Sequence, residues 1–455
     1  MERRNFFKLL TSTSAGLVTG ACGRPGAQLI PLLVSDREIL PAEEQWVPGV
    51  CGECDAGCGV LARVMEGERV VERDGAKLRE RIACIKKLEG NPLDPVSGGR
   101  LCARGHAALQ SLYHPDRLRG PMARKGPRGQ ADLRTITWQE AIAVAAEKLA
   151  HVREKDPTRI VFLARPTAGT RSLAIARFLQ AIGAPPPATF EIADFPLERK
   201  AAELVYGWNG LPVYDLANAR YVLGVGADFL GGWASPVYYA RQFGHFRQGR
   251  PGVRGTLVQA ESRLSITAQS ADQWLPLRPG TEVFFLTAVG CLLLEQKLAR
   301  GAGAVPAEVQ EAFRACDVAG ALRATGLEER QMRRMTRELG ESEAPLVVAG
   351  ASMVHTNSLE ALLLAGYLNR MLGSVGRAGG VLAPTPEPTQ SRPAFSNSVA
   401  LLEKAQFLFL DGANPAYTLP AATGVARHLS RVETMVSFSP LLDDSGAYAD
   451  LLLPD

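Results

Sequence analysis

The central and C-terminal parts of the chain alternate between short apolar runs and longer amphipathic stretches. The short runs lack a polar face, which is typical of strands buried on both sides of a parallel sheet. We expect such strands at residues 159–164, 221–225, 256–259, 346–349, 407–410 and 435–438. Their alternation with helices predicts an α/β fold with doubly wound parallel sheets, in which ligands bind beyond the carboxyl ends of the strands.

The helices carry signals of their own. Thr137 and Glu140 form a capping box ahead of an apolar periodicity, which predicts a helix through residue 150. Two more helices are expected at 170–182 and 281–297. The apolar centre of the last one is shorter than the roughly 20 residues that cross a bilayer, so we interpret it as a core helix.

The first 22 residues have the features of an export signal. An Arg3-Arg4 pair precedes two phenylalanines and a lysine, which indicates the twin-arginine route and a periplasmic destination. Cys22 ends a Thr-Gly-Ala-Cys sequence similar to a lipoprotein cleavage box, so it either carries a lipid anchor or is lost by cleavage nearby. Residues 23–45 contain proline and glycine and are predicted to be a linker.

The composition excludes several classes of protein. The 455 residues are 46% hydrophobic and 22% charged, so the chain is neither disordered nor collagen-like. The net charge is only +4 and no long basic block occurs, which argues against nucleic acid as a partner. Eight cysteines are too few for a disulfide scaffold, so their positions matter more than their number.

Four cysteines have the spacing of an iron–sulfur site. Cys51, Cys54 and Cys58 share one glycine-rich loop, and Cys102 lies farther along in another glycine-containing segment. Three thiolates on one loop and one remote thiolate can hold a 4Fe–4S cluster. Zinc sites more often use two short cysteine hairpins, and cysteines so close in sequence pair poorly in disulfides. We therefore favour an iron–sulfur cluster over zinc or disulfides.

The other cysteines have different surroundings. Cys84 lies in a charged segment and is the alternative to Cys102 as fourth ligand, although it lacks nearby glycines. Cys291 and Cys316 lie in apolar helical patterns and are predicted to be buried structural residues.

The cysteine motif resembles the N-terminal domain of the molybdopterin (bis-guanine dinucleotide) oxidoreductases, the family of dimethyl sulfoxide reductase and formate dehydrogenase. The similarity continues through Glu89-Gly90-Asn91-Pro92, Cys102-Ala103-Arg104-Gly105 and residues 113–118. It implies an iron–sulfur domain at 46–118, followed by molybdopterin oxidoreductase-like α/β domains at 119–455. Arg104 matches the family's basic residue between cluster and pterin, and residues 72–86 look like an insertion.

Later segments extend the resemblance to the family's nucleotide-binding turns. It implies that molybdopterin guanine dinucleotide, if bound, is held by Gly226, Asp228, Arg278, Gly280, Thr281 and Glu282. Glu282 stands where the family usually has Asp. Residues 412–415 and 449–454 resemble two further family signatures.

Two departures from the family limit the expected chemistry. The segment that supplies the molybdenum ligand in active members contains no Cys or Ser, and Asp194 is the only substitute on offer. The family's C-terminal dinucleotide domain is expected to be missing, because the sequence stops at Asp455. His355 is a weaker candidate for the pterin cavity, and Asp443-Asp444 is predicted to be a solvated turn.

Residues 206–218, 226–230 and 235–238 are most similar to the molybdopterin-like iron–sulfur subunit of alternative complex III and related quinone-linked complexes. This resemblance implies an electron-transfer or scaffold subunit that is not catalytic on its own. Its implied partners are a ferredoxin-like iron–sulfur chain, a polytopic quinone-binding membrane subunit and a cytochrome c. The alternatives are part of an active molybdenum enzyme completed by another chain, and a non-redox assembly subunit.

Overall fold

The computed structural model describes residues 40–455, apart from 55, 74, 167–169, 191–194, 249–250, 351–357 and 385–397. The predicted export signal, Cys22, Asp194 and His355 lie outside the described residues. Among the described helices, none combines the length and apolar character needed to cross a membrane.

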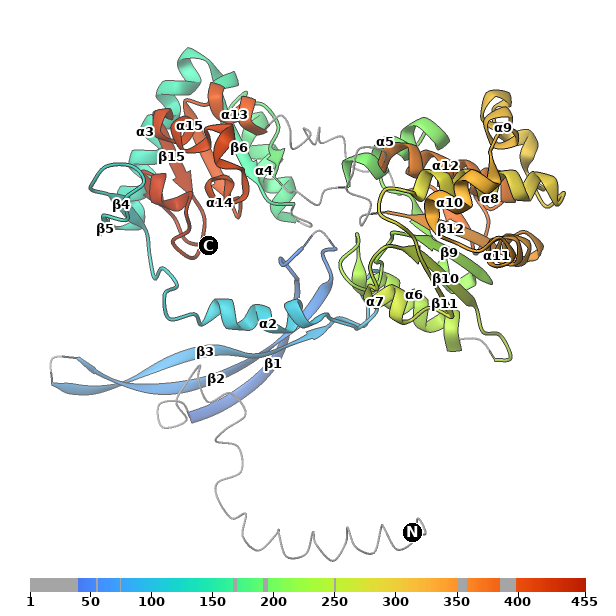
Figure 1. The fold of residues 1–455 in the computed structure, drawn as a ribbon. Coiled ribbons are helices and arrows are strands. Elements are labelled where there is room, and N and C mark those ends of the chain that lie inside the picture. Colours follow the sequence, from blue (N-terminus) through green and yellow to red (C-terminus); the bar gives the residue numbers. More distant parts are fainter. Residues whose placement is uncertain are drawn as a thin grey trace, which may run out of the picture.

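The N-terminal part is a three-stranded antiparallel sheet of β1 (Leu40–Val50), β2 (Gly59–Arg73) and β3 (Ala76–Gly90), followed by α2 (Ala103–Leu112). Strand β1 begins inside the segment predicted to be a linker, so the ordered domain starts earlier than expected. The predicted insertion at 72–86 comprises the end of β2, the turn and most of β3 in the long β2–β3 hairpin, which projects from the rest of the molecule (Figure 1).

The first α/β unit is a seven-stranded sheet in the order β5-β4-β16-β15-β14-β6-β7. Its strands are β4 (Met122–Arg124), β5 (Leu133–Thr135), β6 (Ile160–Ala164), β7 (Ala188–Thr189), β14 (Phe407–Asp411), β15 (Thr434–Ser437) and β16 (Leu451–Leu452). Helices α3 (Trp138–Lys155) and α4 (Thr170–Ala181) pack on one face, while α13 (Ser398–Lys404) and α15 (Val425–Arg431) cover the other. The neighbouring strands β7, β6, β14, β15 and β16 run parallel to one another. Strand β4 pairs antiparallel with β16, and β5 pairs antiparallel with β4.

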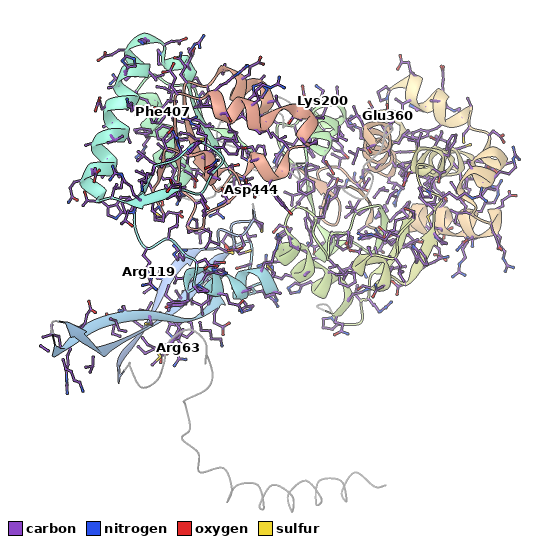
Figure 2. The ribbon with its side chains drawn as sticks, turned by 60° about the vertical axis from the view of Figure 1, so that its left-hand side comes forward. Arg63, Arg119, Lys200, Glu360, Phe407 and Asp444 are labelled. Carbon is purple, nitrogen blue, oxygen red and sulfur yellow. The ribbon has the colours of Figure 1, made fainter. Side chains whose placement is uncertain are left out.

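The second α/β unit is a four-stranded parallel sheet in the order β11-β10-β9-β12. Its strands are β9 (Tyr221–Val225), β10 (Thr256–Glu261), β11 (Gln273–Pro276) and β12 (Pro345–Ala349). One face is covered by α8 (Glu282–Glu295), α11 (Glu329–Glu341) and α12 (Ser358–Leu372), the other by α6 (Pro236–Gln248). Glu360 of α12 and Asp444 of the first unit mark the two bodies in Figure 2.

The remaining elements connect or edge these sheets. They are α5 (Pro196–Tyr206), β8 (Val213–Tyr214), α7 (Ile266–Gln269), α9 (Ala307–Arg314), α10 (Val318–Thr325), β13 (Val381–Leu382) and α14 (Pro415–Thr418). Short 3₁₀ turns lie at Pro157–Arg159, Leu216–Asn218, Ala302–Ala304, Ala421–Thr423 and Gly446–Tyr448. Strands β8 and β13 form a small antiparallel pair.

The doubly wound parallel architecture is therefore confirmed. Thr137 caps α3 by accepting a hydrogen bond from the amide of Glu140 at 3.1 Å, and the helix runs on to Lys155, beyond the predicted end. The apolar helix α8 lies in the core, as predicted, with Phe285 and Leu292 fully buried.

Each sheet has a point where the strand order reverses. In the first unit β6 lies between β7 and β14, and in the second β9 lies between β10 and β12. The first sheet is also discontinuous in sequence, since β6 and β14 are neighbours although the whole second unit separates them along the chain. Such reversal points form crevices beyond the carboxyl ends of the strands, where ligands bind in doubly wound folds.

Candidate functional site: a cysteine loop on the first sheet

The three clustered cysteines occupy a closed loop between β1 and β2. The amide of Cys51 donates a hydrogen bond to the carbonyl oxygen of Cys58 at 2.8 Å, and the amide of Gly57 reaches the carbonyl of Cys54 at 3.4 Å. Gly57 has a φ of +55°, a conformation that glycine adopts without steric cost. The loop therefore folds back on itself and holds the three cysteines on a short arc.

Cys102 approaches this loop from the start of α2. It is the residue before the helix, and its carbonyl accepts a hydrogen bond from the amide of His106 at 3.0 Å. Burial, as the largest cause, and the neighbouring Cys54, Cys51, Asp94 and Cys102 together raise the pKa of the Cys58 thiol to about 11. Burial likewise raises the pKa of Cys51, which also responds to Cys54 and Cys102. These mutual effects show that the four predicted sulfurs share one electrostatic environment.

Cys84 belongs to a different environment. It is 7% exposed on β3, where its side chain lies beside the hydroxyl group of Tyr113. The Tyr113 hydroxyl donates to the carbonyl of Ile85 at 3.0 Å and accepts from the amide of the same residue at 2.7 Å. Burial raises the pKa of Tyr113 to about 12, and Cys84 contributes to the increase. The structure thus brings Cys102, rather than Cys84, to the cysteine loop.

The spacing of these thiols bears on the kind of metal they could hold. Within the described part of the chain, no three His, Cys, Asp or Glu side chains are grouped closely enough to hold a metal ion. A tetrahedral zinc site needs such a group, because all four ligands contact one ion. In a 4Fe–4S cluster each thiolate binds a different iron, so the four sulfurs stand farther apart. In number and residue type the four cysteines match the ligands of such a cluster, which stays a prediction from their spacing in the sequence.

Arg104 lies two residues after Cys102, in the first turn of α2, and its side chain is exposed. The neighbouring Gly105 is buried against Leu101, whose Cδ1 would lie 2.5 Å from an added Cβ. The structure therefore packs this turn closely at Gly105, while Arg104 faces outward.

The residues expected to contact a guanine dinucleotide lie at the carboxyl edge of the second sheet. Gly226 follows β9 with a φ of +63°, and Asp228 comes two residues later. Oδ1 of Asp228 accepts hydrogen bonds from the Thr267 hydroxyl at 2.8 Å and the Thr267 amide at 3.2 Å. Asp228 thereby holds the start of α7 against the end of β9.

The second predicted set follows β11 along the same edge. Gly280 has a φ of +78°, and the Thr281 hydroxyl donates to the carbonyl of Arg278 at 2.6 Å. The Arg278 guanidinium donates to the carbonyl of Arg323 at 2.7 Å, near the end of α10. Glu282 is buried in the first turn of α8, where the helix dipole favours a carboxylate. These hydrogen bonds use one N–H donor of Arg278 and Oδ1 of Asp228, so both side chains keep polar atoms for contacts to a dinucleotide.

Three predictions outside the site have clear outcomes. Cys291 and Cys316 are only partly buried, not fully buried as predicted, and burial raises the pKa of both thiols. In the predicted turn Asp444 is exposed, but Asp443 accepts a hydrogen bond from the amide of Gly446 at 2.6 Å and burial raises its pKa. Only Asp444 matches the description of a solvated acid.

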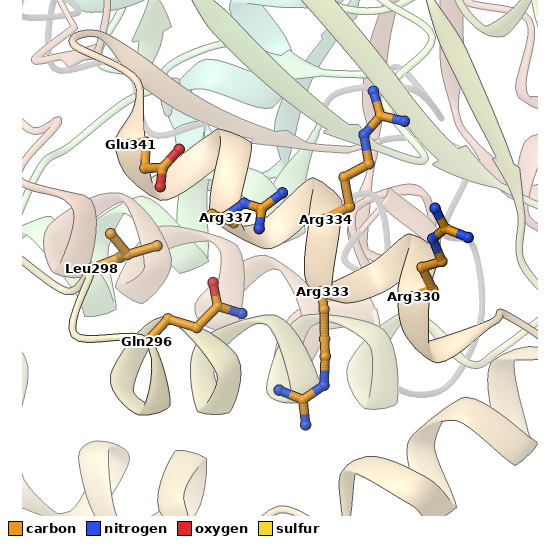
Figure 3. Close-up of a pocket in the computed structure, with 7 residues that line it drawn as sticks. All are labelled: Gln296, Leu298, Arg330, Arg333, Arg334, Arg337 and Glu341. Atoms are coloured by element: carbon orange, nitrogen blue, oxygen red, sulfur yellow. The ribbon is translucent and has the colours of Figure 1, made fainter.

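A separate cavity of about 680 Å³ lies along α11 (Figure 3). Four arginines of this helix line it: Arg330, Arg333, Arg334 and Arg337. Arg333 pairs with Glu329 at 2.7 Å and Glu295 at 3.0 Å. The cavity is a charged surface feature with no contact to the cysteine loop, so we do not assign it to the site.

Sequence reasoning missed Arg165, the residue directly after β6. Its guanidinium lies against the cysteine loop, because a Cβ on Gly52 would stand 3.2 Å from its Nη2 atom. The available signal was a basic residue immediately after a buried strand, where doubly wound folds place ligand contacts. Asp94 was missed as well, although it accepts a hydrogen bond from the Gly59 amide next to Cys58.

Residues 117–455 match the molybdopterin oxidoreductase family, and residues 44–114 match the molybdopterin oxidoreductase Fe4S4 domain. The menaquinone reductase molybdopterin-binding-like subunit of Nitratidesulfovibrio vulgaris is 26% identical over all of this chain and 65% of its own length. The thiosulfate reductase molybdopterin-containing subunit of Salmonella typhimurium is 25% identical over 90% of this chain and 57% of its own length.

A solved structure shows the same fold. Acetylene hydratase from Pelobacter acetylenicus superposes with a TM-score of 0.65 at 16% identity, covering 90% of this chain and 62% of that one. The chain thus spans less than two thirds of the length of each of these three proteins.

Proposed function

Because the chain belongs to the molybdopterin oxidoreductase family and carries that family's Fe4S4 domain, we propose that it is an electron-transfer subunit of a quinone-linked respiratory complex. Its cluster would be held by Cys51, Cys54, Cys58 and Cys102. The observation that carries this proposal is the meeting of Cys102 with the closed loop of the other three cysteines, while Cys84 lies beside Tyr113. The similarity to a menaquinone reductase subunit supports the choice of complex.

A bound 4Fe–4S cluster supplies one-electron transfer. The chain's own residues would hold that cluster and set its surroundings. The closed loop fixes three thiols, and the start of α2 brings the fourth. Iron binds the thiolate form of cysteine, whereas burial and the neighbouring groups raise the pKa of Cys58 to about 11. Cluster assembly would thus release protons and lock the loop to α2.

The rest of the assignment follows from the sequence and the relatives. We place the protein on the periplasmic side of the membrane, exported by the twin-arginine signal at its N-terminus. Its electron partners would be an iron–sulfur chain, a quinone-binding membrane subunit and a cytochrome c. The family match also supports a molybdopterin cofactor, which Asp228 and Arg278 at the edge of the second sheet would contact, but electron transfer through the cluster needs no step on it.

The test compares Cys102→Ser with Cys84→Ser in the full chain purified without oxygen. The wild-type protein should contain about four iron atoms and give a reduced-cluster EPR signal. Cys102→Ser should lose most of that iron and signal, and Cys84→Ser should keep both. The reverse pattern would assign the fourth ligand to Cys84. Stoichiometric molybdenum with a Mo(V) signal would replace the electron-transfer assignment with a catalytic one.

A further inference from the structure

We propose that Arg165 is a positioning residue that raises the reduction potential of the cluster, acting as a fixed positive charge between the cysteine loop and the first sheet. This inference rests on the proposed function, because it needs a cluster in that loop. Under this proposal, a residue outside the cysteine domain helps to set the reduction potential of the cluster.

Arg165 occupies the reversal point of the first sheet. It directly follows β6, and its amide donates a hydrogen bond to the carbonyl of Asp411, the last residue of β14, at 2.8 Å. The strand order reverses between these two strands. Arg165 therefore stands where doubly wound folds place their ligands.

The guanidinium is held between two glycines. An added Cβ on Gly52 would lie 3.2 Å from Nη2, and one on Gly412 would lie 2.9 Å from Nε and 2.6 Å from Cδ. Gly52 directly follows Cys51, and Gly412 directly follows β14. The glycines leave the room that the arginine fills, so its charge lies against the backbone of the cysteine loop.

The charge of Arg165 has no counterpart in the described protein. Its Nε is buried without a hydrogen-bond partner, and none of the ion pairs among the described residues includes it. The carboxylate of Asp411, at the end of the neighbouring strand β14, instead accepts two hydrogen bonds from Arg171 at 3.0 and 2.6 Å. Arginine stays protonated in proteins, and even a partly buried charge without a partner is disfavoured. A negatively charged group at the cysteine loop would remove that cost.

A 4Fe–4S cluster with four thiolates is such a group. It carries a net negative charge in both oxidation states and gains one more on reduction. A nearby cation stabilises the reduced state more than the oxidised state, since the Coulomb energy grows with the charge. Charge and exposure around a cluster are among the factors that set its potential. Arg104 is exposed, so water weakens its effect, whereas the partly buried Arg165 is screened less.

The experiment measures the cluster's midpoint potential by EPR-monitored redox titration of the full chain. Arg165→Gln and Arg165→Met remove the charge, and Arg165→Lys keeps it. Arg159→Gln is the matched control, because it removes an arginine from the opposite end of β6. That end lies roughly 15–20 Å away at about 3.3 Å per residue, beyond the Debye length. Iron content is measured for every variant.

Both neutral variants should titrate at a lower potential than the wild type, while Arg165→Lys and Arg159→Gln should stay close to it. A neutral variant with full iron and the wild-type potential would overturn the role of Arg165. An equal decrease in Arg159→Gln would also overturn it, because the effect would then be one of overall charge. Absence of iron from the wild type is a separate outcome, which refutes the proposed function itself.

Discussion

The amide of Gly59 donates a 2.8 Å hydrogen bond to Oδ2 of Asp94, which joins the end of the cysteine loop to the segment that leads to Cys102. The same oxygen accepts from the amide of Ser97 at 3.0 Å. The contact is close, since a Cβ on Gly59 would stand 2.7 Å from the Cβ of Asp94. One carboxylate thus fixes the distance between the two parts of the proposed cluster site.

We therefore expect Asp94→Asn to weaken cluster retention. The amide side chain has one acceptor oxygen in place of two and loses the charge that strengthens these hydrogen bonds. Iron loss to a chelator under anaerobic conditions should be several-fold faster than in the wild type. Asp116→Asn is the control, because the Asp116 side chain is 87% exposed. Equal rates in all three proteins would contradict the anchoring role.

The same carboxylate predicts a pH dependence. Burial alone would raise the pKa of Asp94, but hydrogen bonds from Gly59, Ser97 and Val96 outweigh it and lower the pKa below its ordinary value. Because the pKa of Asp94 is lower in the folded than in the unfolded protein, its carboxylate contributes fully to stability above the unfolded pKa, about 3.9. That contribution is lost as the pH falls through the folded pKa. The difference in iron retention between wild type and Asp94→Asn should be constant above about pH 5 and shrink below about pH 4. Chelator assays at stepped pH measure it, and a difference that already shrinks between pH 7 and pH 5 would oppose this assignment.

Loss of Arg171 should destabilise the first sheet. Its guanidinium makes two hydrogen bonds to Asp411, whose side chain is only 3% exposed. Arg171→Met leaves a buried carboxylate without its partner, so we expect the free energy of unfolding to fall by about 2–3 kcal/mol. Arg323→Met breaks an ion pair whose side chains are 74% and 71% exposed. It should change the free energy of unfolding by less than about 0.5 kcal/mol. Urea titrations of the wild type and both variants measure these two changes in the free energy of unfolding.

Gly290 should not tolerate even one added methyl group. On α8, a Cβ at this position would lie 2.3 Å from Cδ1 of the fully buried Phe313. Gly290→Ala should therefore lower the melting temperature, with a cost of about 1–3 kcal/mol, and the added change Phe313→Leu should recover part of it. Gly244→Ala on α6 meets no atom within 4 Å and should raise stability by about 0.5–1 kcal/mol. If Gly290→Ala matches Gly244→Ala, the packing described for α8 is wrong.

The sequence was most informative where local physical rules act alone. The apolar runs of β9 and β14 predicted strands because both faces of these strands are covered, and all five residues of each are buried. Thr137 predicted a helix start because capping depends on residues within one turn. The helix passed its predicted end because Val152, 2% exposed, still packs against the sheet.

The candidate site was predictable only in part. The cysteine spacing indicated a shared site, since a loop of eight residues keeps its members close. The place of Arg165 after a buried strand was predictable, but its contact with Gly412 was not, because the β6–β14 pairing joins distant parts of the chain. The hydrogen bond from Arg278 to Arg323 likewise depends on how α10 packs against α8. Such long-range contacts have no signature in a single sequence.

The discontinuity of the first sheet has a consequence for how the molecule is made. Strand β6 leaves the ribosome roughly 240 residues before its neighbour β14. At a synthesis rate of about 5–20 residues per second, β6 remains without its neighbour β14 for roughly 12 to 50 seconds. The second unit lies within that interval and can fold during it. Newly made chains would therefore expose an unpaired hydrophobic edge for much of their synthesis, and we expect them to depend on chaperones until β14 emerges.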